Sequence, residues 1–179
     1  MYNIDYLNLH HDSQSGLVIA SRFNIAQESS IFFKQRSKGC LHAKINGVHI
    51  YNLHLDVKSE ETRLKQIRHV FKYIKLNENC IVVGDFNSLN KNDYSPKKYL
   101  DMIVKKRAYI PNKHLVINYV KKYMYDGIAY TNAKQITTSF HNVRCDYVFI
   151  SRSMINSNNK LFILNNIRFS DHFPIIFEY

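Results

Sequence analysis

The stretch Cys80-Ile81-Val82-Val83-Gly84-Asp85-Phe86-Asn87 decides the fold of this 179-residue chain. Its first four residues are apolar and mostly β-branched, which is typical of a buried strand. Gly84 permits a sharp exit from the sheet, so Asp85 and Asn87 lie where a strand passes into a loop. A carboxylate there can act as a base or bind a hard cation, and a carboxamide can donate to a phosphate oxygen. A simple Asp/Asn turn is the alternative interpretation.

The composition indicates one globular domain over residues 1–179, because 45% of the residues are hydrophobic and supply a core. No apolar run has the length of a transmembrane helix, and the N-terminus lacks the order of a signal peptide. We therefore expect a soluble, intracellular protein. Cys40, Cys80 and Cys145 are far apart in strand-like runs, which predicts buried free thiols rather than a zinc site.

Periodicity and turn residues predict an alternation of strands and helices. Asn46-Gly47 between two apolar runs is a strong hairpin signal. Ser59 and Ser95-Pro96 are expected to start helices, and the spacing of apolar residues weakly favours a third helix within 111–125. Residues 2–15 are expected to be an irregular lead-in. Strands are predicted at 16–20, 40–45, 48–53, 80–83, 144–150, 161–164 and 173–178, with a short one at 31–33.

Four polar sites lie at the ends of predicted strands. They are Asn52 with His54, Asp85 with Asn87, Asp146, and Asp171 with His172. Taken singly, each fits a structural histidine or a capped turn. Together they suit the attack of water on a phosphate ester. A histidine can serve as acid, base or cationic contact, a carboxylate orients the water, and a divalent cation neutralises charge.

Five segments of the chain resemble, in order, the motifs of the endonuclease/exonuclease/phosphatase superfamily. This superfamily includes deoxyribonuclease I, exonuclease III-type apurinic endonucleases, sphingomyelinases and inositol polyphosphate 5-phosphatases. The segments are GLVIASR at 16–22, YNLHLD at 51–56, IVVGDFN at 81–87, RCDYVFIS at 144–151 and SDHFPI at 170–175. The Arg63…Gln66 spacing on the predicted helix is also similar.

The resemblance implies an α/β fold, a four-layered sandwich of two facing mixed sheets with helices outside. It also implies a phosphoesterase that acts on phosphodiester or phosphomonoester bonds with Mg²⁺ or Mn²⁺. By this resemblance His54 would contact the scissile phosphate beside Asn52. Asp85 would orient or deprotonate the attacking water, and Asn87 would bind the phosphate.

The resemblance also assigns roles to the later motifs. Asp146 would be the active-site Asp of its strand. Asp171 would orient His172 or assist the metal, and His172 would act on the phosphoryl group. The metal ligands would be Asp85, Asn87, Asp171 and His172.

The chain departs from the family pattern at its front. Family members carry leading strands and the main metal-binding Glu before the 16–22 segment, and Glu28 comes after it, in the wrong order. We therefore expect the first sheet to lack its leading strands. A longer gene product, a degenerate relative, or a partner that supplies the missing half would each account for this.

The net charge of +11 favours an anionic partner. Nucleic acid is the preferred substrate, and phosphorylated lipids and inositol phosphates remain alternatives. A coding bias toward Lys and Asn is the competing explanation of the charge. The rival function is a catalytically impaired module that binds nucleic acid or a protein.

Overall fold

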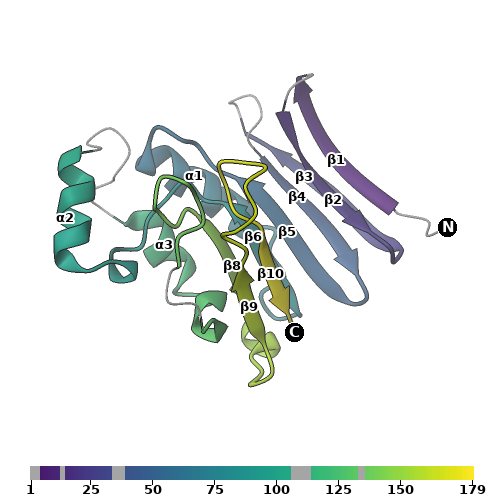
Figure 1. Cartoon of the computed structure of the whole chain (residues 1–179). Coiled ribbons are helices and arrows are strands. Elements are labelled where there is room, and N and C mark those ends of the chain that lie inside the picture. Colours follow the sequence, from purple (N-terminus) through teal and green to yellow (C-terminus); the bar gives the residue numbers. More distant parts are fainter. Residues whose placement is uncertain (1–4, 13–14, 34–38, 106–113, 133–135) are drawn as a thin grey trace.

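The computed structural model describes residues 5–12, 15–33, 39–105, 114–132 and 136–179. Its centre is a six-stranded sheet in the order β3-β4-β5-β6-β8-β7 (Figure 1). Strands β5 and β6 are parallel and the other neighbours are antiparallel, so the sheet is mixed. The six strands are β3 (Ile25–Phe32), β4 (Gly39–Ile45), β5 (Val48–His54), β6 (Cys80–Asp85), β7 (Tyr125–Asp126) and β8 (Asp146–Ile150).

Two hairpins and three α-helices surround this sheet in the described part of the chain. The hairpins pair β1 (Asp5–Asp12) with β2 (Ser15–Ser21), and β9 (Lys160–Ile163) with β10 (Ile175–Glu178). The helices are α1 (Glu60–Phe71), α2 (Pro96–Lys105) and α3 (Leu115–Val120), and short 3₁₀ turns lie at Lys91–Asp93, Gly127–Tyr130 and Arg152–Met154. None of the described helices combines the length and apolarity that a membrane crossing requires.

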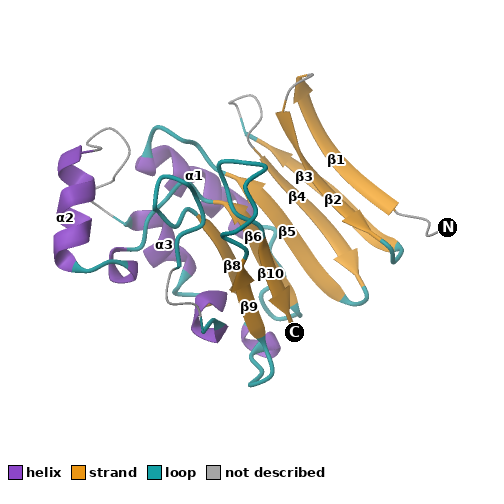
Figure 2. Ribbon diagram, in the orientation of Figure 1, coloured by secondary structure: helices purple, strands orange, loops and turns teal. Residues whose placement is uncertain are grey.

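The two faces of the central sheet pack against different layers (Figure 2). One face lies against α1 and α3, where Leu53 and Phe149 join Ile67 and Ile117 in the main core. Both hairpins lie on the other face. Ile19 of β2 packs on residues of β4, and β9 and β10 pack on β6 and β8. The mixed α/β fold class predicted from the sequence is confirmed, and the structure shows a six-stranded mixed sheet faced by two antiparallel two-stranded hairpins.

Local signals fix the hairpin and the first helix as predicted. Asn46 and Gly47 both have positive φ, 49° and 80°, which a tight two-residue turn requires. Ser59 caps α1, since its Oγ accepts from the Thr62 N–H at 3.2 Å. The three cysteines are buried free thiols, as predicted.

Three local predictions need correction or refinement. The irregular lead-in predicted at 2–15 is wrong where the structure describes it, because β1 occupies Asp5–Asp12 and pairs with β2; residues 2–4 and 13–14 lie outside the described residues. The short strand predicted at 31–33 belongs to the longer strand β3, whose side chains are mostly exposed at the sheet edge. The helix favoured within 111–125 is confirmed as α3, and residues 111–113 lie outside the described residues.

Candidate active site

Three predicted site residues lie side by side on adjacent strands of the central sheet. His54 ends β5, Asp85 ends β6 and Asp146 begins β8. In the strand ladder His54 is opposite Asp85, and Asp85 is opposite Asp146. Residues opposite each other project from the same face, which here is the face that carries the hairpins. The register of the sheet therefore places His54, Asp85 and Asp146 in one row.

Each carboxylate of the row is paired with an imidazole. His54 Nε2 lies 3.4 Å from Asp85 Oδ2, and His172 Nδ1 lies 2.8 Å from Asp146 Oδ2. Like charges directly opposite in a sheet destabilise it, so a partner on each outer side offsets the repulsion. The hydrogen bond to Asp146 raises the pKa of His172 to about 9, although burial opposes this shift. His172 is therefore an imidazolium at neutral pH.

Thr138, in the loop before β8, holds the Asp146–His172 pair in place. Thr138 Oγ1 accepts from the backbone N–H of Cys145 and of Asp146, each at 3.1 Å. The Thr138 carbonyl accepts from the N–H of Phe173 at 2.8 Å. The same residue thus anchors the strand that carries Asp146 and the segment that carries His172.

Asn87, two residues after the end of β6, holds the Asp85 carboxylate in one orientation. Its backbone N–H donates to Asp85 Oδ1 at 2.7 Å, and its Nδ2 donates to Asp85 Oδ2 at 3.0 Å and to the Leu55 carbonyl at 3.1 Å. The φ of Asn87 is 47°, a left-handed conformation that Asn tolerates better than most residues. Both amide hydrogens of Asn87 are used within the protein, so the structure gives it a positioning role at Asp85.

Two further predicted residues have other partners than the sequence suggested. The ring of His172 is oriented by Asp146, whereas the exposed Asp171 carboxylate accepts from Ser170 Oγ at 3.3 Å. Asn52 donates from Nδ2 to the Val18 carbonyl at 3.0 Å and so ties β5 to β2.

The four predicted metal ligands fall into two groups. Asp85 ends β6 and contacts Asn87 two residues further along, while Asp171 and His172 lie on the segment before β10. The hydrogen bond to Asp146 occupies Nδ1 of His172, so a cation at this nitrogen would have to replace the proton. Mg²⁺ usually needs only one or two carboxylates, with waters and substrate phosphate completing its shell. The side-chain oxygens of Asp85 and Asn87 are the type of ligand that Mg²⁺ prefers.

Solved structures of phosphate-cleaving proteins share this architecture. An AP endonuclease from Archaeoglobus fulgidus gives a TM-score of 0.72 at 16% identity, covering 97% of this chain and 79% of that one. A 3′-5′ exonuclease, NExo, from Neisseria meningitidis gives 0.74 at 14% identity, covering 98% and 79%. A NExo structure described as a 3′ phosphatase bound to a product DNA hairpin gives 0.73, also at 14% identity, over the same shares of the two chains.

The chain has the endonuclease/exonuclease/phosphatase fold. No protein-family model and no curated protein sequence matches it. The likeness is therefore carried by the arrangement of the elements.

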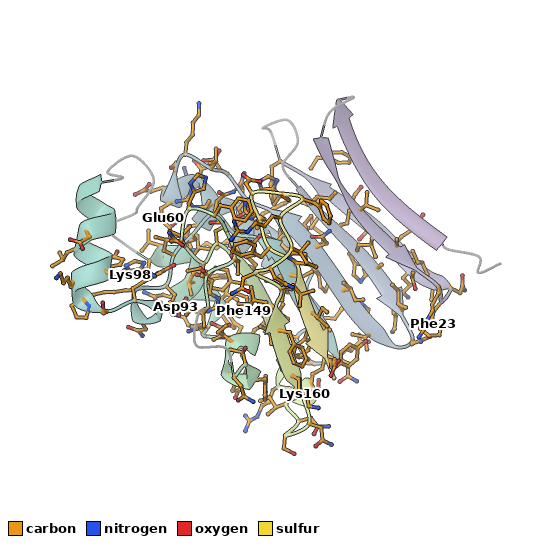
Figure 3. All side chains as sticks on the ribbon, in the orientation of Figure 1. Phe23, Glu60, Asp93, Lys98, Phe149 and Lys160 are labelled. Carbon is orange, nitrogen blue, oxygen red and sulfur yellow. The ribbon has the colours of Figure 1, made fainter. Side chains whose placement is uncertain are left out.

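Within the endonuclease/exonuclease/phosphatase fold, a buried ion pair supports the loops beside the row. Glu60, labelled in Figure 3, pairs with Arg63 Nε at 2.9 Å and accepts from Ser88 Oγ and from the Val116 N–H, both at 3.0 Å. Arg63 also donates to the Asp56 carbonyl at 2.8 Å. Glu60 and Arg63 thus connect α1 to the segments that follow His54 and Asn87.

A second buried cation fixes the start of β8. Arg144 is paired with Asp126 and with Asp93, and its guanidinium lies 4.1 Å from the ring centroid of Tyr147. The Tyr147 hydroxyl donates to the Ser88 carbonyl at 3.1 Å. This cluster locates Asp146, which lies between Arg144 and Tyr147 in the chain.

Sequence reasoning missed several supporting residues. Thr138 lies outside every recognised motif, and a polar Thr-Thr-Ser run gives no signal that distinguishes a structural hydroxyl from a loop. The sequence does carry a signal for Glu60, because its position three residues before Arg63 is the spacing of a helical ion pair. Cys145 was expected only to be buried.

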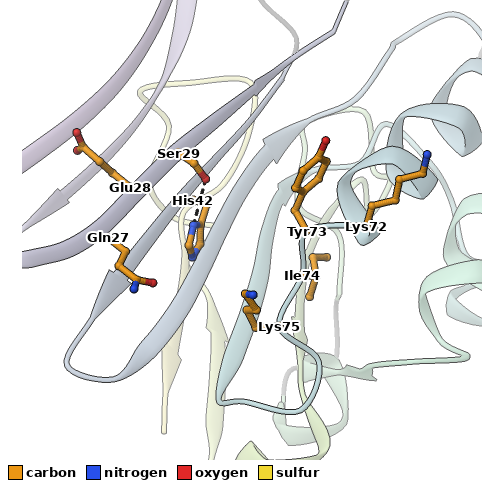
Figure 4. Close-up of a pocket in the computed structure, with 8 residues that line it drawn as sticks. All are labelled: Gln27, Glu28, Ser29, His42, Lys72, Tyr73, Ile74 and Lys75. Atoms are coloured by element: carbon orange, nitrogen blue, oxygen red, sulfur yellow. Dashed lines mark hydrogen bonds between the residues drawn. The ribbon is translucent and has the colours of Figure 1, made fainter.

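A second polar cluster lies on the helix-covered face at the β3 edge, and Figure 4 shows two of its members, Ser29 and His42. His49 Nε2 contacts Glu78 at 3.0 Å, His42 Nε2 contacts His49 Nδ1 at 2.8 Å, and Ser29 Oγ contacts His42 Nδ1 at 3.2 Å. A carboxylate only accepts, so His49 donates to Glu78 from Nε2. Burial is the main reason why the pKa of His42 falls to about 4, and the ring stays neutral. His42 and Ser29 line a cavity of about 530 Å³.

Proposed function

We propose that this protein is a phosphoesterase that hydrolyses phosphodiester or phosphomonoester bonds with the help of a divalent cation. The row of His54, Asp85 and Asp146, with His172 at its end, is the observation that carries the proposal. The fold supports it, because similar structures include an AP endonuclease and a 3′-5′ exonuclease.

The charges of the row suggest how the protons move. Asp85 orients a water beside the phosphate and accepts its proton as the water oxygen bonds to phosphorus. The bond from phosphorus to the leaving oxygen breaks, and the imidazolium of His172 donates a proton from Nε2 to that oxygen. Asp146 holds the other ring nitrogen of His172 and keeps the ring charged. His54 adds a donor near the phosphate.

A divalent cation, when bound at the Asp85 and Asn87 oxygens, would neutralise charge on the phosphate and the leaving oxygen. Mg²⁺ and Mn²⁺ both suit oxygen donors. Asn87 keeps the Asp85 carboxylate in one orientation for either role.

Nucleic acid is the favoured substrate. The net charge is +11, and a NExo structure of the same fold holds a DNA hairpin product. A cavity of about 530 Å³ next to the His172 segment is lined by Arg168, Phe140 and Phe173, among others. A guanidinium suits phosphate and aromatic rings suit bases.

The test is a turnover assay with Mg²⁺ on DNA that carries an abasic site, a 3′-phosphate or a free 3′ end. RNA, a phosphorylated lipid and an inositol phosphate complete the panel. His172→Ala should lower the rate about 10²- to 10⁴-fold, since it removes the general acid. His69→Ala is the matched control, because His69 is an exposed histidine on α1 that contacts Tyr73.

Equal rates in the wild type and His172→Ala would refute the catalytic assignment. Salt-dependent DNA binding without Mg²⁺ binding or turnover of any substrate would favour the rival, a non-catalytic nucleic-acid-binding module.

A further inference from the structure

A thiol lies against the Asp146–His172 pair. Cys145 Sγ is 3.4 Å from Asp146 Oδ2 and 3.9 Å from His172 Nδ1, and those two atoms are 2.8 Å apart. In the described part of the chain, this is the one group in which three His, Cys, Asp or Glu ligand atoms lie within 4.8 Å of one another. A sulfur, a nitrogen and an oxygen donor therefore converge at one point.

The size of this triangle suits a tetrahedral cation. Zn²⁺ binds sulfur at about 2.3 Å and nitrogen or oxygen at about 2.0–2.1 Å, which separates the ligand atoms by roughly 3.3–3.6 Å. The sulfur–oxygen separation of 3.4 Å lies within this range, while the separations of 2.8 and 3.9 Å lie below and above it, so shifts of about half an ångström would close the site around an ion. The Asp146 and His172 side chains are 17% and 34% exposed, which leaves a route for the ion and a fourth position for water.

We propose that Cys145, Asp146 and His172 bind a thiophilic divalent cation such as Zn²⁺, and that the bound ion blocks the Asp146–His172 pair. The mixed S, N and O donors suit Zn²⁺, whereas Mg²⁺ prefers six oxygens. The ion replaces two protons, the one on the Cys145 thiol and the one between His172 and Asp146. When Nδ1 of His172 binds the metal, the ring has lost the proton at that nitrogen and is no longer a cationic imidazolium. The inhibitory part of this proposal rests on the proposed phosphoesterase function.

The other two thiols provide an internal comparison. Cys40 and Cys80 are buried in the apolar core beneath α1, and within the described residues neither belongs to a group of three metal-ligand atoms. Burial raises the pKa of all three thiols, that of Cys145 included, so the thiols differ in their neighbouring ligand atoms and not in this property. A cadmium–thiolate signal that depends on Cys145 can therefore be distinguished from binding at a buried thiol elsewhere.

The first experiment titrates metal-free protein with Cd²⁺, a thiophilic analogue of Zn²⁺, and follows the ultraviolet cadmium–thiolate absorption. The wild type should show a band that saturates at one equivalent. Cys145→Ser should lose the band and bind Cd²⁺ at least about tenfold more weakly, and Asp146→Asn should weaken binding as well. Cys40→Ser is the matched control and should behave like the wild type. Thermal unfolding confirms that each variant folds.

An absent band in the wild type, or an unchanged band in Cys145→Ser, would overturn the site. The second experiment adds buffered Zn²⁺ to the Mg²⁺-supported assay and compares each protein with its own zinc-free rate. We expect the wild type to be inhibited about tenfold more than Cys145→Ser at the same Zn²⁺ concentration. Equal inhibition would overturn the regulatory role. Failure of the phosphoesterase proposal leaves the Cd²⁺ result unaffected, because that titration contains no substrate.

Discussion

At the scale of single residues, the charge of His172 depends on one neighbour. The hydrogen bond to Asp146 is the largest cause of its raised pKa of about 9, and Asp171 contributes least among the causes. Because the folded pKa is above the ordinary value of about 6.5, this pair stabilises the fold fully below pH 6.5. The contribution disappears as the pH rises through about 9.

Asp146→Asn should therefore lower the pKa of His172 toward its ordinary value, because the carboxylate that holds the proton is removed. Ring signals in a histidine NMR titration measure this directly. The unfolding free energy of the variant should lose the decline that the wild type shows between pH 6.5 and about 9. Asp171→Asn is the control and should shift the pKa less. A larger shift in that control would contradict the assignment of Asp146 as the partner.

Gly84 is required where β6 approaches β5. Its φ is 129°, and a Cβ placed there would overlap the carbonyl oxygen of Leu53. Gly84→Ala should lower the unfolding free energy by about 3 kcal/mol or more, since backbone strain and a clash with the main chain combine. Gly47→Ala is a matched control at φ 80° with no atom within 4 Å, and should cost only about 1 kcal/mol. Urea unfolding measures both, and equal costs would contradict the steric argument.

At the scale of elements, helix α1 supports the site through its buried polar side. Glu60 and Arg63 are 5% and 2% exposed, and their ion pair reaches the segments after His54 and Asn87. A buried charge that loses its partner is strongly destabilising. The helix therefore acts as a support for two loops as well as a cover for the core.

Glu60→Gln should lower the unfolding free energy by about 2–4 kcal/mol, because the Arg63 charge stays buried without its counter-charge. Glu61→Gln is the matched control one residue along, where the side chain is exposed, and should change it by about 0.5 kcal/mol or less. Chemical denaturation monitored by circular dichroism measures both. A similar small effect at both positions would show that the Glu60–Arg63 pair does not support the loops.

The elements that the sequence predicts well carry their own local signals. The 46–47 turn, the Ser59 cap and the apolar run before Gly84 each specify structure within a few residues. Strand β1 was missed because it forms by pairing with β2, and strand formation depends on such partners more than on composition. Strand β3 was predicted too short, because an exposed edge strand needs no apolar alternation.

At the scale of the whole molecule, the layer over the row consists of two separate hairpins. The described strands β1–β2 and β9–β10 are each two-stranded sheets. A two-stranded sheet alone is marginally stable in water, so both hairpins depend on packing against the central sheet. The motifs predicted the residues of the row, and the ladder register brings three of them together. The partners of Asn52, Asn87 and Asp171 depend on side-chain contacts between segments, which no spacing reveals.

The row of His54, Asp85 and Asp146 is spaced by main-chain hydrogen bonds, with neighbouring strands about 4.7–4.9 Å apart. Every residue type except proline supplies these bonds, so substitutions in the strands leave the spacing unchanged except at Gly84, where a side chain would meet the Leu53 carbonyl. Solved structures at 14% and 16% identity, with TM-scores of 0.74 and 0.72, share this fold, so the arrangement of the strands is kept while nearly all sequence likeness is absent. Insertions act differently. One extra residue inside β6 would turn the Asp85 carboxylate toward the helices, so strand length is under tighter constraint than strand composition.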